Sequence, residues 1–554
     1  MNAETRDGTV SLREADGGLR QRLGRVGSWV DGLPSKRAIA LLLACSTVVW
    51  ALQSVAWPVV AGRDLGTYLR YYAQMWDWHA VFPQAMVGRT PGAPLVLGLM
   101  LELGPTAIEV LMAVLFVASV LSWTLVAASW GRRASALVAA TLLLYPGYGA
   151  LFHQFSSDAL SAAAFAFWSL AAVRISLRPT TLRFALLGLG AVALVLIRPG
   201  NQVLLVVGLV ALLLGGVWRG RIARTIAFYA VAVAFLALWA GNNAVRYDDF
   251  TVARGANIGV PFLRAFSVDR IVSPENGAAS RRLADAVQRR LLPEEPYRSY
   301  RIGVNDFFSS GSDRMMEDVA SFTDRTFGWE SDYAILREAG LEAVRKHPRA
   351  YARGVAGTLW QLLRSPAYVT PPQPSGDGGA GGTSTPSDTI TVAGRTLPKP
   401  SEGDLIPSSH QGLWVSTPDN RIREVWTSPT DHHLVFRDPE DAVHAEQIDS
   451  RMGRLSSRLP QASGNATLAH RLNQAAYRFP PPASWLLVGL VAVCARRPRN
   501  VSIPLVLSVA GFLLLFVTAL GYPAQGEYSM PVVPAFALLA GVGLLGPSGA
   551  RKSG

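Results

Sequence analysis

Long apolar runs divide this chain, and they constrain its fold more than any other feature. A helix needs roughly 20 consecutive apolar residues to cross a bilayer, because unsatisfied backbone groups are costly in hydrocarbon. Such runs lie at about 38–60, 105–130, 134–152, 159–174, 184–199, 202–218, 225–244, 484–495, 501–521 and 531–547. The sequence therefore predicts an all-α polytopic membrane protein of about ten transmembrane helices, with a mixed extracytoplasmic domain.

The composition agrees with a membrane protein. Only 16% of the 554 residues are charged and 50% are hydrophobic, whereas soluble domains carry about 25% charged residues. Two cysteines are too few for a disulfide framework. The net charge of +13 does not favour a nucleic-acid partner, because the arginines form small clusters between the apolar runs instead of one basic stripe.

The basic residues predict an orientation, since short cytoplasmic loops retain Lys and Arg. The segments assigned inside hold 20 of the 52 basic and only 5 of the 39 acidic residues. They are residues 1–37, Arg132 with Arg133, Arg174 to Arg183, Arg219 to Arg224, Arg496 to Arg499, and Arg551 with Lys552. The preference for Arg over Lys suggests a bacterial genome rich in G and C, and hence the bacterial plasma membrane.

Five segments follow from this topology. They are a cytoplasmic tail at 1–37, a membrane module at 38–245 whose first outer loop is 61–104, an extracytoplasmic domain at 246–480, a flexible loop at 371–403 within that domain, and C-terminal membrane helices at 481–554. The amphipathic stretch His347 to Leu363, with Trp360 on its apolar side, predicts a helix lying on the membrane; a buried helix of the outer domain is the alternative.

The first outer loop carries an unusual pattern. Asp64 follows the first apolar run and precedes an aromatic-rich helical stretch that includes Tyr68; Arg89, Pro91 and Pro94 come later. A structural interpretation is an interfacial helix capped by Asp64, with aromatic side chains at the lipid headgroups.

These motifs resemble the first lumenal loop of the C-type, polyprenyl-phosphate-sugar-dependent glycosyltransferases, a superfamily that includes protein O-mannosyltransferases and aminoarabinose transferases. The resemblance extends to Ser156-Ser157-Asp158, to Ile197-Arg198-Pro199 and to Glu527-Tyr528 before Pro531 and Pro534. It covers the membrane part and not the domain at 246–480. Leu65 stands where many relatives have a second acid.

The resemblance implies transfer of a hexose or pentose from a polyprenyl-phosphate donor to a glycan, lipid or protein acceptor on the outer face. The lipid phosphate is a good leaving group, so such a protein must deprotonate the acceptor hydroxyl, hold the phosphate and exclude water. We assign the base to Asp64, with a single displacement that inverts the anomeric carbon.

Asp158 is a second catalytic candidate, which would orient the acceptor or bind a divalent ion together with Asp64. Its structural alternative is a helix N-cap. The superfamily has members with and without a metal, so the metal stays unknown and no cofactor is required by the sequence.

Three arginines are candidates for the donor phosphate. Arg198 ends an apolar run, where a charge is costly unless it is paired or hydrated, and a guanidinium can grip phosphate bidentately. Arg63 and Arg89 are further candidates. The alternative for Arg198 is snorkelling to the interface.

Four more residues are expected along the substrate groove: Tyr68, His153, Glu527 and Tyr528.

A different class of function is a transporter or a flippase for lipid-linked sugars, which would use charges along a pathway and often shows two related halves. No such symmetry is visible. A non-catalytic scaffold, with the outer domain as its binding module, is the third interpretation.

Overall fold

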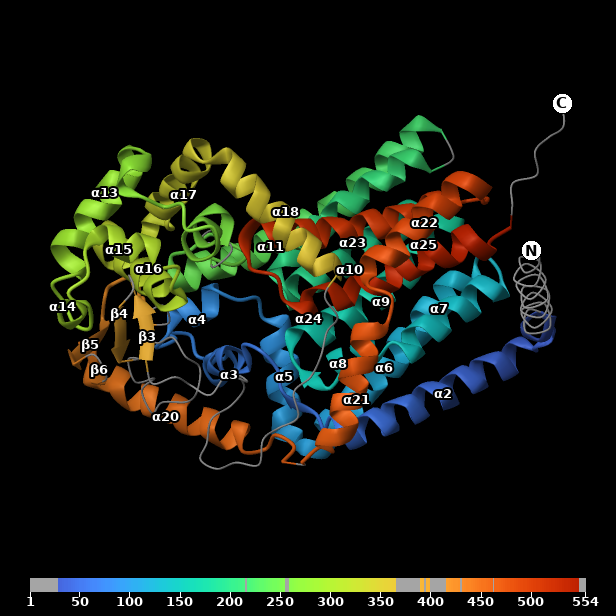
Figure 1. Cartoon of the computed structure of the whole chain (residues 1–554), viewed down its shortest axis with the longest axis horizontal. Helices are drawn as coiled ribbons and strands as arrows, with labels where there is room; N and C mark the ends of the chain where they lie inside the picture. Colours follow the sequence, from blue (N-terminus) through green and yellow to red (C-terminus); the bar gives the residue numbers. More distant parts are fainter. Residues whose placement is uncertain are drawn as a thin grey trace, which may run out of the picture.

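The computed structural model describes residues 28–214, 217–254, 259–364, 389–392, 395–398, 415–428, 431–461 and 463–547. Long helices form a bundle, and shorter helices with small sheets form an outer domain at one end of it (Figure 1). The first and last described residues lie at the opposite end of the bundle.

Among the described residues, seven helical stretches are long and apolar enough to cross a membrane. They are α2 (Ser35–Ala56), α6 (Pro105–Ala128), α9 (Ser157–Leu177), α11 (Trp218–Tyr247), Ala466–Arg496, α23 (Ser502–Gly521) and Gly526–Leu545. Shorter apolar helices are α5 (Gly92–Leu103), α10 (Thr181–Ile197) and η1 (Pro199–Leu213). The chain is therefore a multi-pass membrane protein, although the described residues do not establish the expected number of ten spans.

Each of the ten apolar runs contains a helix, and prolines separate helices both within one run and next to another. The run at 134–152 forms α7 (Arg132–Leu144) and α8 (Pro146–Leu151), which separate at Pro146. The stretch Ala466–Arg496 is α21 (Ala466–Arg478) followed by α22 (Pro482–Arg496). Proline lacks an N–H and clashes with the preceding turn, so a helix ends before it.

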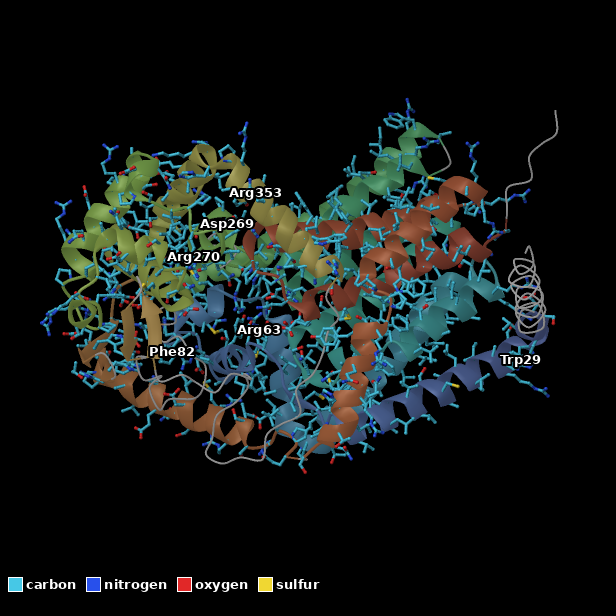
Figure 2. The ribbon with its side chains drawn as sticks, viewed as in Figure 1. Trp29, Arg63, Phe82, Asp269, Arg270 and Arg353 are labelled. Atoms are coloured by element: carbon cyan, nitrogen blue, oxygen red, sulfur yellow. The ribbon has the colours of Figure 1, made fainter. Side chains whose placement is uncertain are left out.

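Several of the segments assigned to the inside meet at one end of the bundle. The Arg133 guanidinium lies 2.7 Å from the Asp31 carboxylate, and the Trp130 indole donates to the Asn500 carbonyl at 3.1 Å. The Arg499 amide donates to the Pro547 carbonyl. Trp29 lies at this end, whereas Arg63 lies where the bundle meets the outer domain (Figure 2).

The first half of the outer domain is helical. It contains η2 (Gly259–Val268), η3 (Pro274–Asn276), α13 (Ala278–Ala286), η4 (Val287–Leu291), α14 (Tyr297–Tyr300), α15 (Val304–Ser309), α16 (Asp313–Phe327), η5 (Trp329–Ser331) and α17 (Ala334–Lys346). These elements surround a separate apolar core, with fully buried side chains such as Phe262, Leu283, Phe307 and Leu336. This core is separate from the larger one that the membrane helices share.

The helix expected at 347–363 is α18 (Pro348–Arg364), and it has two different faces. Val355 and Leu362 pack against Leu515 and Ala519 of the apolar helix α23. Trp360, expected on the apolar side, is 55% exposed. The helix therefore lies against a membrane helix instead of being buried within the outer domain.

In the described part of the second half of the outer domain, two antiparallel strand pairs precede a long helix. The pairs are β3 (Thr389–Val392) with β4 (Arg395–Pro398), and β5 (Ile422–Ser428) with β6 (Asp431–Phe436); α20 (Pro439–Ser456) follows. Most of the loop expected at 371–403 lies outside the described residues, but β3 and β4 fall within its range.

The outer domain is fixed to the first outer loop, whose helices are α3 (Leu65–Gln74), α4 (Pro83–Val87) and α5. From α20, Arg451 donates to the Ala73 carbonyl at 3.0 Å, and Asp449 pairs with Arg70 at 3.9 Å. Arg421, next to β5, donates to the Ala80 carbonyl at 2.7 Å. The position of α3 is therefore tied to both parts of the molecule.

Candidate active site

The first two outer loops are joined by a short parallel pairing. Strand β1 (Val60–Ala61) pairs with β2 (Gln154–Phe155), and the Gly62 amide donates to the Phe155 carbonyl at 3.1 Å. A Cβ at Gly62 would lie 2.4 Å from the Ser156 Cβ. Only glycine allows this approach, which brings the residues after Gly62 next to the start of α9.

Asp64 occupies the residue before α3 but does not cap it. Its backbone is left-handed (φ 59°), and its side chain makes no capping hydrogen bond. The carboxylate is 43% exposed and lies 3.6 Å from the Arg89 guanidinium. Non-glycine residues in this conformation are uncommon and concentrate at functional sites.

Arg63 faces the last outer loop. Its guanidinium donates to the Tyr528 hydroxyl at 3.1 Å and lies 3.8 Å from the Glu527 carboxylate. Both of these residues belong to α24 (Gly526–Ser529). The Arg63 side chain is 44% exposed. Arg63 thus meets Glu527 and Tyr528, two predicted residues more than 450 positions away in the chain, beside Asp64.

Asp158 and Arg198 form an ion pair, which links the start of α9 to the end of α10. Asp158 is buried, while Arg198 is 28% exposed and lies over the Tyr528 ring at 4.8 Å from its centroid. The N-cap of α9 is Ser156, which accepts from the Ala159 amide, so the capping role considered for Asp158 is wrong. Asp158 instead fixes the Arg198 guanidinium.

Tyr68 lies on the buried side of the cluster. It is buried, and its hydroxyl donates to the Ser157 hydroxyl at 2.8 Å. Burial, assisted by the nearby Asp64 carboxylate, raises the pKa of Tyr68, so the phenol keeps its proton. Tyr68 therefore serves as a neutral hydrogen-bonding wall.

A close contact between helices places Arg89 in this cluster. A Cβ at Gly92, at the start of α5, would lie 2.6 Å from the Leu196 carbonyl near the end of α10. This approach brings Arg89 to the end of the bundle where Arg198 lies. Tyr522, which the sequence did not suggest, also acts electrostatically on Arg89; its only signal is its place in the last outer loop.

The cluster contains three guanidiniums and three carboxylates from four separate segments. They are Arg63, Arg89 and Arg198 with Asp64, Asp158 and Glu527. Because Arg63, Arg89 and Arg198 are each at least 28% exposed, an anion could reach them from solvent or lipid. The arrangement suits a phosphate beside one accessible carboxylate.

His153 does not join the cluster. Its ring is fully buried and stacks on Trp50 at 4.1 Å, with Trp57 edge-on at 6.1 Å. Burial lowers the pKa of His153 to about 3, so the ring is neutral. His153, which was expected along the substrate groove, is thus part of an aromatic core next to β2.

The carboxylates are a poor donor set for a divalent cation. Such ions prefer several oxygen ligands, whereas Asp64 faces Arg89 and Asp158 faces Arg198. Across the described ranges, no group of three or more His, Cys, Asp or Glu side chains is arranged to hold a metal ion.

No family model and no curated protein sequence matches the chain. Two crystal structures of ArnT from Cupriavidus metallidurans are similar to it. The one bound to undecaprenyl phosphate has 14% sequence identity over 93% of this chain and 78% of that chain, with a TM-score of 0.30. The apo structure has 13% identity over 92% and 78%, with a TM-score of 0.29. At these TM-scores the likeness does not establish a shared fold.

Proposed function

We propose that this chain is an integral-membrane glycosyltransferase that moves a sugar from a polyprenyl-phosphate donor to an acceptor on the outer face of a bacterial plasma membrane. The observation that carries the proposal is a cluster at one end of the helix bundle, in which Asp64 pairs with Arg89 while Arg63 and Arg198 both contact Tyr528 close by. These residues come from segments that the motifs had singled out separately.

The proposed reaction is a single displacement. The Asp64 carboxylate takes the proton of the acceptor hydroxyl, and the acceptor oxygen forms a bond to the anomeric carbon of the donor sugar. The bond between that carbon and the phosphate oxygen breaks, and both bonding electrons leave with the phosphate. Attack opposite the leaving group inverts the anomeric configuration.

The arginines would stabilise the leaving phosphate. Arg198 is fixed by Asp158 and supported by the Tyr528 ring, so its guanidinium is preorganised before the donor binds. Arg63 is held by Tyr528 and Glu527 in the same region. Arg89 would pair with the phosphate once Asp64 turns to the acceptor. Asp158 is a positioning residue in this scheme.

The proposal is tested with purified full-length protein in proteoliposomes, supplied with a panel of polyprenyl-phosphate hexoses and pentoses. A membrane extract serves as the source of acceptor. We expect one donor to yield free polyprenyl phosphate and a sugar-labelled product of inverted configuration. Movement of intact lipid-linked sugar between leaflets without cleavage would contradict transfer and favour a flippase.

A further inference from the structure

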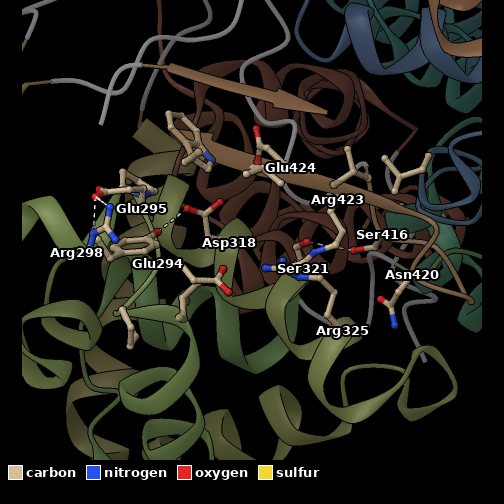
Figure 3. A pocket seen from close by; sticks show the side chains of 18 residues that line it. Glu294, Glu295, Arg298, Asp318, Ser321, Arg325, Ser416, Asn420, Arg423 and Glu424 are labelled. Carbon is tan, nitrogen blue, oxygen red and sulfur yellow. Dashed lines mark hydrogen bonds and ion pairs between the residues drawn. The ribbon is translucent and has the colours of Figure 1, made fainter. Parts of the chain in front are cut away.

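The outer domain contains a pocket of about 350 Å³ that includes neither Asp64 nor Arg198. Helix α16 and the segment 291–298 form one wall, and β5 with the residues before it forms the other (Figure 3). Three polar residues of these walls, Asp318, Ser321 and Ser416, are each at least nine-tenths buried. The volume falls within the range of small-molecule sites.

Both hydrogen-bond donors and acceptors line this pocket. Its lining carries four carboxylates and three guanidiniums, namely Glu294, Glu295, Asp318 and Glu424 with Arg298, Arg325 and Arg423. The Trp426 and Tyr297 rings complete the wall. Sugar hydroxyls both donate and accept hydrogen bonds, and an indole offers an apolar face with a polar edge. The mixture suits a polyhydroxyl ligand, whereas four carboxylates oppose a simple polyanion.

A second compartment of about 350 Å³ adjoins the first, and its charge is different. It shares Glu294, Arg325, Asn420 and Arg423 with the first pocket and adds two more arginines, Arg290 and Arg437. Four arginines and one glutamate line it. A ligand that occupies both compartments is therefore extended, with hydroxyls along its length and an anionic group at one end.

The two compartments have a fixed position relative to the candidate active site. Arg421 directly precedes β5 and is hydrogen-bonded to the Ala80 carbonyl of the first outer loop. Helix α20 is anchored on α3, which starts directly after Asp64. A polymer held in the groove would thus lie at a constant distance from the proposed base.

We propose that these two compartments form one groove that binds an acidic oligosaccharide segment of the acceptor. This inference rests on the proposed transferase function and names its acceptor class. The groove holds the acceptor at a distance from the reacting hydroxyl, so its residues are specificity-determining and not catalytic.

Binding to the detergent-solubilised full chain tests the proposal, with maltotetraonic acid, a tetrasaccharide that carries one carboxylate at its end, and neutral maltotetraose as probes in calorimetry. We expect the acidic tetrasaccharide to bind more tightly. Arg290→Ala should weaken it about tenfold, as for loss of one charge-assisted hydrogen bond. The matched control is Arg289→Ala, because Arg289 lies beside Arg290 on η4, is 75% exposed and does not line the groove. Trp426→Ala should weaken the binding of both tetrasaccharides.

Two results would overturn the proposal. One is the absence of binding by either tetrasaccharide, or binding that Arg290→Ala and Trp426→Ala leave unchanged in folded protein. The other is equally tight binding of inorganic phosphate that Trp426→Ala does not affect, which would indicate a plain anion site. Asp64→Asn should retain tetrasaccharide binding. Sugar transfer without tetrasaccharide binding would refute only the proposal that the groove binds the acceptor. Tetrasaccharide binding without sugar transfer would refute only the proposed reaction.

Discussion

At the scale of single residues, the proposed reaction depends on how each charge in the cluster is held. Asp158 and Arg198 form a pair in which the carboxylate is buried and the guanidinium is partly accessible. Removing one partner of such a pair leaves the other uncompensated. The two residues should therefore act as one unit, with Arg198 as the member that contacts the donor phosphate.

This coupling gives the first prediction. Arg198→Gln should lower the rate of transfer by about 100-fold, as for loss of one preorganised donor to a developing anion. Asp158→Asn should have a smaller effect, and the double variant should be no slower than Arg198→Gln alone. Initial rates across donor concentrations measure this cycle. Additive losses would show that Asp158 acts independently of Arg198.

The buried His153 gives a prediction for stability against pH. In the folded protein the pKa of His153 is about 3, and in the unfolded chain it is near 6.5. The unfolded state thus binds more protons between these values, so the neutral ring contributes stability above pH 6.5 that is lost as the pH falls toward 3. In this window the loss is about 1.4 kcal/mol per pH unit.

His153→Phe keeps a ring against Trp50 and removes the titrating nitrogens. Its thermal midpoint in detergent should fall less steeply than that of the wild-type protein between pH 6.5 and pH 5. Midpoints recorded by intrinsic fluorescence at several pH values test this. Equal slopes for both proteins would mean that His153 does not titrate with unfolding.

At the scale of elements, the packing of α3 on α5 sets the position of Asp64. A Cβ at Gly98 of α5 would lie 2.1 Å from the Tyr72 ring of α3. Because the ring and α3 would have to move, the start of α3 would move with them. Overpacking of this kind costs roughly 1–3 kcal/mol.

Gly98→Ala is therefore expected to lower both the thermal midpoint and the rate of transfer. The matched control is Gly241→Ala in α11, where a Cβ would meet nothing within 4 Å. That change should stabilise the helix by up to about 1 kcal/mol. Thermal unfolding and transfer assays on both variants decide the matter. A fully active Gly98→Ala protein would show that the position of α3 is not critical.

The elements also show how far the sequence could predict the structure. Apolar runs predicted the bundle, because a bilayer demands continuous apolar helices. Asp64, Arg89, Asp158 and Arg198 could be placed at one end, because their segments alternate with basic loops. The ion pairs among them could not be predicted, since they depend on close contacts such as those at Gly62 and Gly92.

The sequence motifs could not predict two features of the structure, namely the position of His153 and the groove in the outer domain. His153 follows an apolar run, and its polar side chain suggested an outer position, but packing between tryptophans decides its place. The groove in the outer domain joins residues around 294, 325 and 423. Such contacts between distant segments leave no periodic signal in the sequence.

At the scale of the whole molecule, the two ends of the bundle differ in chemistry. Basic loops meet at one end, and the acid–arginine cluster with the outer domain lies at the other. From the positive-inside rule we propose that the cluster faces the outside. A reaction there would need a donor and an acceptor that are both available on the outer face.

Cysteine labelling on intact cells tests this sidedness. In a Cys45→Ser/Cys494→Ser background, Asp77→Cys in the first outer loop should react with a membrane-impermeant maleimide. Arg178→Cys, after α9, should react only after the cells are opened. Both positions are exposed in the folded chain. The reverse labelling pattern would place the cluster in the cytoplasm.

The role of Asp64 as the base is tested by the rate of sugar transfer in proteoliposomes for Asp64→Asn and a matched control. Asp248→Asn is that control, because Asp248 is exposed and has the same left-handed backbone (φ 53°, against 59° for Asp64). We predict that Asp64→Asn lowers transfer by at least about 100-fold, as for loss of a general base. Asp248→Asn should transfer at the wild-type rate. Full transfer by folded Asp64→Asn protein would contradict the assignment of Asp64 as the base.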